Sequence, residues 1–264
     1  MKKKLKSLLK LSLPYVVTIF LPILSTLFLS RTVVSNFQEK IVSEKQKSIE
    51  ASYNRFLRKI DAIEQLMYTI AKSDELGEYV SVAKGESGHS VSEYMAVKNM
   101  LSSLMIDSNV IAIYYFDHVD GRIITNDASY SQIDSYFLHR YQIEDYTVEE
   151  YVKNLKNLTR GRVYSSKISA RFDKKAVEVI EYKMAMPMDL NSKLKGQLVM
   201  IIDASELFCD ITEVLDANSE LYIYDSNNVL IYSNGNQFEG VFESVLEEGL
   251  QQIEVGETTV WHMA

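Results

Sequence analysis

The segment between Lys10 and Arg31 constrains the chain most, because it holds twenty consecutive residues without a formal charge. In an α-helix that rises about 1.5 Å per residue, twenty residues span roughly 30 Å, the thickness of the hydrocarbon core of a bilayer. Pro14 and Pro22 within it would interrupt a soluble helix but are tolerated in membrane-spanning helices. The sequence therefore predicts a transmembrane helix over residues 11–31.

The charges that flank this segment predict its orientation. Residues 1–10 carry five lysines and no acid, which indicates a basic cytoplasmic tail by the positive-inside rule. Residues 32–264 would then be extracellular, after a single membrane crossing within this sequence. A cleaved signal peptide is the alternative, but its apolar core is shorter, and LFLSRTVVSN offers no small-x-small cleavage site.

A long spine helix is predicted over residues 34–72, which contain no glycine or proline. Apolar residues recur every seven positions, in an a/d heptad pattern that polar residues flank. They are Val42, Ile49, Phe56, Ile63 and Ile70, with Tyr53, Ile60 and Met67 at the second position. Two interpretations compete: a parallel coiled coil that forms a homodimer, or a helix whose apolar stripe packs on the chain's own lobes. In either case the helix is suited to transmit a mechanical signal.

Two similar lobes are expected after this helix, at residues 73–204 and 205–264. Ala112–Asp127 reads as strand, turn and strand, with the turn at Asp120-Gly121. Glu220–Asn234 repeats this order, with its turn at Asn227-Asn228. Repetition at this distance indicates two copies of one fold unit.

The remaining elements of each lobe follow from local patterns. In the first lobe they are a helix near Thr147–Leu158, with Thr147 as N-cap, and strands at 162–168, 176–188 and 197–203. In the second they are a helix over 205–215, a helix over 238–248 and a strand over 256–263. The second lobe is two strands short of the first, which we interpret as truncation. The fold class is α+β, with helices on one side of antiparallel sheets.

Charge and motifs exclude several classes of function. The net charge is −8 although the first 31 residues carry six positive charges and no acid, so the acidic remainder is unsuited to nucleic acid. Neither a catalytic histidine spacing nor a phosphate-binding glycine-rich loop is present. Asp117 and Asp120 flank His118, but a strand–turn position favours a solvated hairpin over a metal site. We therefore expect no enzyme, no metal and no cofactor.

Together these features resemble the double-Cache (tandem PAS-like) sensor region of bacterial receptors, over the whole chain. The segment EDYTVEEYVKNL followed by RVYSSKI looks most like membrane-anchored AraC-type transcriptional regulators. The resemblance implies an extracellular, ligand-sensing part that passes ligand occupancy to a cytoplasmic output domain outside this sequence. A sensor histidine kinase or chemotaxis receptor ectodomain is the alternative, as is a membrane-tethered binding protein without signalling output.

The resemblance also implies where a small-molecule ligand binds, since the membrane-distal lobe usually holds it. Members that sense amino acids carry an Arg-x-Trp-Tyr type motif, which RGRVYSSKIS echoes without its tryptophan. That difference argues against a simple amino acid. The candidate ligand-binding residues are Tyr151, Arg162, Tyr164, Tyr182 and Asp203. The competing interpretation places the aromatic residues in the sheet core and Arg162 in solvent.

Overall fold

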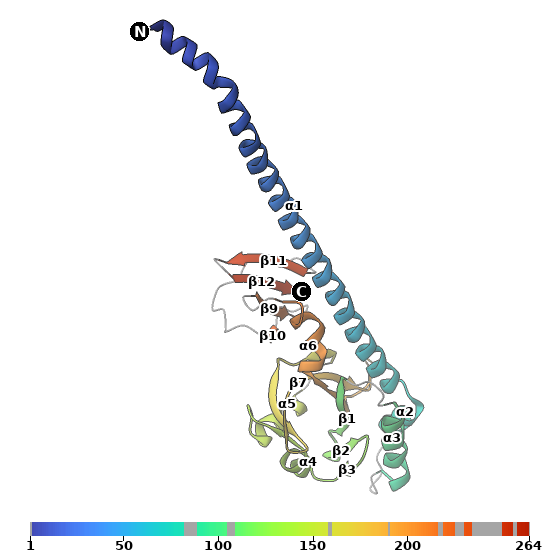
Figure 1. Cartoon of the computed structure of the whole chain (residues 1–264). Helices are drawn as coiled ribbons and strands as arrows, with labels where there is room; N and C mark the ends of the chain where they lie inside the picture. Colours follow the sequence, from blue (N-terminus) through green and yellow to red (C-terminus); the bar gives the residue numbers. More distant parts are fainter. Residues whose placement is uncertain are drawn as a thin grey trace. The chain divides into compact units, whose positions relative to one another are not determined.

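The computed structural model describes residues 2–81, 89–104, 109–157, 160–189, 191–215, 219–224, 230–233, 250–255 and 258–263. The chain divides into two compact units, Met1–Ala51 and Ser52–Ala264. The first unit is the N-terminal part of one continuous helix, α1 (Lys2–Ala71) (Figure 1). Residues 11–31 and the spine helix both lie in α1, so both are helical as predicted. Within the described part of the chain, no helix is long and apolar enough to span a membrane.

The first lobe is built on an eight-stranded sheet in which every strand pair is antiparallel, as predicted. The order is β3-β2-β1-β8-β7-β6-β4, and β5 also pairs with β7. The strands are β1 (Val110–Asp117), β2 (Arg122–Thr125), β3 (Ser129–Tyr130), β4 (Tyr141–Ile143), β5 (Arg162–Tyr164), β6 (Ile168–Phe172), β7 (Lys175–Met186) and β8 (Gly196–Asp203).

Local chemistry explains two details of this sheet. The predicted turn between β1 and β2 is present, and Gly121 there has a φ of +63°, which glycine adopts at little cost. The single strand predicted over 162–168 is wrong, because it is divided into β5 and β6. At the division the Ser165 hydroxyl accepts a hydrogen bond from the Glu181 N–H at 2.9 Å, in place of a backbone carbonyl.

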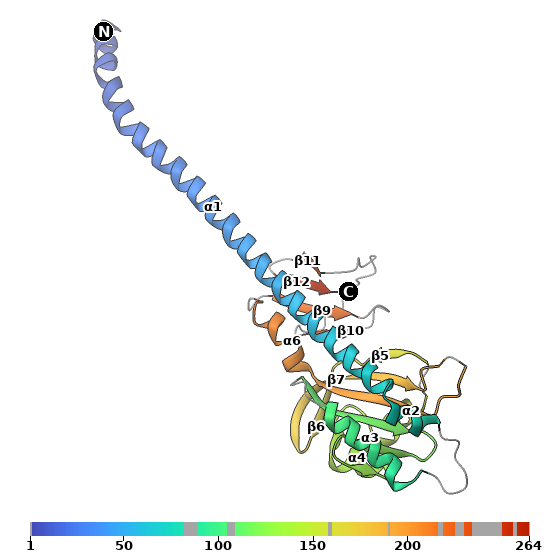
Figure 2. The same cartoon turned by 90° about the vertical axis from the view of Figure 1, so that its right-hand side faces the viewer.

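Helices cover both faces of the sheet (Figures 1 and 2). One face carries α4 (Ile133–His139) and α5 (Val148–Lys156), and the other faces α2 (Asp74–Ser81), α3 (Val91–Leu104) and the end of α1. The prediction of helices on one side only is therefore wrong. The α5 helix begins as predicted, at a capping box in which Thr147 and Glu150 bond each other's backbone N–H.

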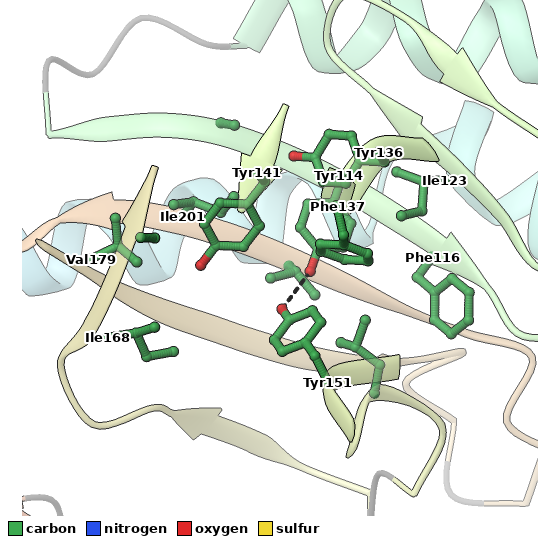
Figure 3. Packing of buried hydrophobic residues seen from close by; sticks show 14 residues of the cluster. Tyr114, Phe116, Ile123, Tyr136, Phe137, Tyr141, Tyr151, Ile168, Val179 and Ile201 are labelled. Atoms are coloured by element: carbon green, nitrogen blue, oxygen red, sulfur yellow. Dashed lines mark hydrogen bonds between the residues drawn. The ribbon is translucent and has the colours of Figure 1, made fainter. Parts of the chain in front are cut away.

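The core between the sheet and α4 and α5 is rich in tyrosine (Figure 3). Strand β1 alternates, so that Ala112, Tyr114 and Phe116 face these helices. On the opposite face Tyr115 meets the Tyr79 ring of α2 edge-on, with the ring centroids 5.8 Å apart. The sheet therefore separates two packed compartments.

The second lobe begins with α6 (Ala204–Thr212) and continues into a four-stranded sheet of order β10-β9-β12-β11. Its strands are β9 (Ser219–Tyr224), β10 (Leu230–Ser233), β11 (Leu250–Val255) and β12 (Thr258–Met263). The antiparallel pair of β9 and β10 and the strand β12 are confirmed, whereas β11 was not predicted. The turn predicted at Asn227-Asn228 lies outside the described residues. The expectation of a purely antiparallel sheet is wrong here, because β12 runs parallel to β9. The helix predicted over 238–248 lies outside the described residues, and truncation of this lobe stays a prediction.

The heptad stripe packs largely inside the chain. Phe56 stacks on Phe208 of α6 with ring centroids 5.5 Å apart, and Ile63, Met67 and Ile70 are fully buried. These residues are unavailable to a second copy of the chain, which favours the second interpretation of the stripe from Phe56 onward. A homodimer through residues 34–72 stays a prediction that rests on exposed positions nearer the N-terminus, such as Val42.

Candidate functional site

Strand β7 carries two ionisable residues, Glu181 and Lys183, into the compartment under α4 and α5. The predicted alternation is confirmed, because Tyr182 and Met184 point to the opposite face. β7 is an interior strand of the sheet, between β8 on one side and β5 and β6 on the other. The Glu181 side chain is fully buried, and that of Lys183 is 17% exposed. A carboxyl group at the centre of a core needs partners.

Glu181 finds those partners on three sides. Its Oε1 accepts hydrogen bonds from the hydroxyl of Tyr151 at 2.6 Å and from that of Tyr141 at 2.7 Å. Lys183 Nζ lies 2.6 Å from Oε2, an ion-pair contact without hydrogen-bond geometry. The Tyr151 hydroxyl also lies 2.9 Å from that of Tyr114 (Figure 3). We call these five residues the tyrosine–carboxylate cluster.

Four separate elements bring the cluster together. Tyr114 comes from β1, Tyr141 from β4 and Tyr151 from α5, while Glu181 and Lys183 come from β7. A further tyrosine, Tyr136 of α4, packs on the rings of Tyr114 and Tyr141. Its hydroxyl is buried and has no hydrogen-bond partner in the described part of the chain. Buried polar groups are usually satisfied, so this donor is an exception that calls for an explanation.

Burial keeps the tyrosine hydroxyls protonated. Loss of solvation raises the pKa of Tyr114, Tyr141 and Tyr151 well above the usual value of 10, and the nearby Glu181 carboxylate raises each further. Burial raises the pKa of Tyr136 in the same way. The cluster therefore presents hydrogen-bond donors around one carboxylate and one ammonium group.

The structure places three of the predicted ligand-binding residues on the other face of the sheet. The rings of Tyr164 and Tyr182 stack with centroids 4.3 Å apart, and the Tyr164 hydroxyl lies 3.4 Å from Glu64 Oε1 of α1. The side chain of Arg162 is 49% exposed and lies 3.9 Å from Glu64 Oε2. These three residues form one group against α1.

The other two predicted residues lie elsewhere. Tyr151 belongs to the tyrosine–carboxylate cluster, across the sheet from Tyr182. Asp203 caps α6, where its Oδ1 accepts hydrogen bonds from the backbone N–H groups of Ser205 and Glu206. The five predicted residues thus do not meet in one site. Glu181 and Lys183 were not among the site residues predicted from the sequence. The pattern that could have revealed them is a pair of charged residues, two positions apart, on one face of a long strand that pairs with the apolar strand β8.

The described residues also line a pocket of about 200 Å³ beside β5 and the end of β7. Of the predicted residues it includes only Arg162. Its lining residues are Arg160, Gly161, Arg162, Met184, Ala185, Pro187, Met188 and Leu194. Compared with the tyrosine–carboxylate cluster, this pocket has fewer polar groups that point toward one another.

No protein family's sequence profile matches the chain, and no curated protein matches it. Solved structures do match, each at low identity. The extracellular domain of a protein named as a histidine kinase has a TM-score of 0.41 and 16% identity, over 61% of this chain and 57% of that one. The domain of a Vibrio parahaemolyticus sensory box/GGDEF family protein has a TM-score of 0.45 and 14% identity, over 73% and 70%.

A third match is the sensory domain of the Campylobacter jejuni chemoreceptor Tlp3 with isoleucine bound. Its TM-score is 0.44 and its identity 11%, over 85% of this chain and 87% of that one. At such scores these similarities carry no conclusion about what this chain binds. The three names are those of a histidine kinase, a sensory box/GGDEF family protein and a chemoreceptor. The AraC-type resemblance finds no support in them.

Proposed function

We propose that the first lobe binds a small polar molecule at the tyrosine–carboxylate cluster, as the sensing part of a transmembrane signalling protein. The observation that carries this proposal is the full burial of Glu181 in an aromatic core. Taking an ion pair out of water costs several kcal/mol per ion, and apolar residues of similar size are often as stable or more so. A polar cluster that packing alone does not require is typical of a binding site.

The chemistry of the cluster suggests the class of ligand. Glu181 suits a cationic group such as an amine, and Lys183 suits a carboxylate or another anion. Tyrosine hydroxyls, including the unpartnered one of Tyr136, suit further acceptors. A small molecule that carries an amine, a carboxylate or both would form ion pairs with Glu181, with Lys183 or with both, in place of their contact with each other. Because tyrosine rings fill this compartment, binding would move α4 and α5 away from the sheet.

A binding measurement on the full chain tests this proposal. Thermal unfolding is followed with a panel of amino acids, amines and carboxylates, and small molecules released from the natively purified protein are identified by mass spectrometry. We expect one class to raise the Tm of the wild type, and Glu181→Gln to abolish that rise. Glu178→Gln is the matched control, since Glu178 lies on the same strand, 52% exposed, beside Lys167. Equal responses of the two variants would refute the proposal.

We further propose that residues 11–31 anchor the chain in the cell membrane, with residues 1–10 in the cytoplasm and residues 32–264 outside. The support is the uncharged segment with its lysines on one side, together with the continuity of α1 from Lys2 to Ala71. A helix of that length can transmit a shift along its axis. Insertion of one or two alanines after Arg31 is expected to alter signalling in cells, and unchanged signalling would contradict the role of α1.

A further inference from the structure

The turn between β1 and β2 gathers two carboxylates. Asp117 ends β1, and its Oδ1 accepts hydrogen bonds from the backbone N–H groups of Val119 at 2.8 Å and Asp120 at 3.3 Å. This side-chain turn folds the chain back on itself and brings the Asp120 carboxylate beside that of Asp117. The Asp117 side chain is only 3% exposed, whereas Asp120 is at the surface.

A histidine from another part of the chain faces these carboxylates. His89 lies two residues before α3, whose start is fixed by reciprocal bonds between Ser90 and Glu93. Its ring lies flat on the Tyr79 ring, with centroids 3.8 Å apart. Tyr79 in turn donates a hydrogen bond to Asp117 Oδ2 at 3.2 Å. Neighbours on two elements therefore hold the imidazole in place.

One nitrogen of the imidazole is buried and lacks a hydrogen-bond partner among the described residues. The side chain is 4% exposed, and this nitrogen is Nδ1, which lies 3.4 Å from Glu93 Oε2 but makes no hydrogen bond to any residue that the structure describes. Nε2 is 4.0 Å from Asp117 Oδ2, too far for a hydrogen bond. One ligand atom from each of His89, Asp117 and Asp120 lies within 4.8 Å of the others. Ligand atoms about 2.1 Å from a tetrahedral metal ion lie about 3.4 Å apart, so the three side chains would have to draw together by up to about 1.4 Å around an ion.

We propose that His89, Asp117 and Asp120 bind a divalent transition metal ion, Zn²⁺ or Mn²⁺. An imidazole nitrogen with two carboxylates suits such ions better than Ca²⁺ or Mg²⁺, which prefer oxygen ligands alone. The ion would tie the β1–β2 turn to the start of α3. It lies on the face of the sheet opposite Glu181, so this proposal is independent of the proposed ligand site.

Calorimetric titration of the full chain tests this site. After treatment with chelator and its removal, the protein is titrated with Zn²⁺, with Mn²⁺ and, for comparison, with Ca²⁺. We expect one equivalent of Zn²⁺ or Mn²⁺ to bind, and His89→Ala to weaken that binding by at least about tenfold. The control is His139→Ala, which removes an exposed histidine of α4 and should leave the affinity unchanged.

A second variant guards against loss of folding. Asp120→Asn changes an exposed side chain, so it should keep the circular dichroism spectrum of the wild type while weakening the metal by at least about tenfold. Glu181→Gln should leave metal affinity intact, which separates this site from the ligand site. Absence of a saturating one-to-one site, or equal affinity in wild type and in folded His89→Ala and Asp120→Asn, would overturn the proposal.

Discussion

Removal of the charge from Glu181 should lower the free energy of unfolding of the first lobe by about 2–4 kcal/mol. In Glu181→Gln, the hydrogen bonds from Tyr141 and Tyr151 change from charge-assisted to neutral, at a cost of about 1–1.5 kcal/mol each. Loss of one partner of a fully buried ion pair costs about 3–5 kcal/mol. The cost here is smaller, because Lys183 is 17% exposed and its ammonium can turn toward water.

Urea denaturation of the full chain, followed by circular dichroism, measures this effect. Glu178→Gln is the control and should cost less than about 1 kcal/mol, because its pair with Lys167 is exposed. Lys183→Met combined with Glu181→Gln removes the stranded ammonium, so the double variant should lose less than the sum of the single ones, by about 1 kcal/mol or more. A loss below about 0.5 kcal/mol in Glu181→Gln would contradict a buried, ion-paired carboxylate.

Three further predictions concern the same lobe and α1. Thr147→Ala removes the N-cap of α5 and should lower the free energy of unfolding by about 1 kcal/mol in urea denaturation, whereas Thr147→Ser should not. Val42→Lys places a charge at an exposed heptad position, so any dimer seen by light scattering should dissociate to monomer; a persistent dimer would exclude this part of α1 as its interface. Four buried tyrosines have folded-state pKa values above about 10, the value in the unfolded chain. Their contribution to the free energy of unfolding is therefore full below about pH 10 and falls above it. Denaturation measured against pH should show a loss of about 1.4 kcal/mol per pH unit for each such tyrosine; a flat profile above pH 10 would refute it. These tyrosines are Tyr114, Tyr136, Tyr141 and Tyr151.

Elements whose signals are local could be predicted from the sequence. Asp120-Gly121 marks a turn through backbone freedom, and Thr147 with Glu150 marks a helix start through side-chain hydrogen bonds. The α4 helix gave no such signal, because Gln132 at its N-cap makes no capping bond and the helix has only seven residues. The parallel pairing of β9 and β12 depends on how distant segments meet, which residue order alone does not reveal.

The candidate sites were harder to predict for the same reason. Alternation showed that Glu181 and Tyr182 face opposite ways, but not that helices bury both faces. At the β1–β2 turn, sequence proximity offered only His118 beside Asp117, and a solvated hairpin was the favoured interpretation. Neighbouring residues on a strand point to opposite faces, and His118 packs on the Phe116 ring at 4.9 Å. The histidine beside Asp117 is His89 instead, which comes from the approach to α3.

The position of β7 inside the sheet has a consequence for sequence change in this lobe. Glu181 and Tyr182 are adjacent, yet one lies among the tyrosines under α5 and the other stacks against Tyr164 near α1. A deletion of one residue within β7 would exchange them, since a slip by one reverses every side chain of a strand. Pairing along β8 from Val179 to Met186 opposes such a slip. Insertions and deletions among homologues should therefore be absent from β7 and occur in the loops that flank it.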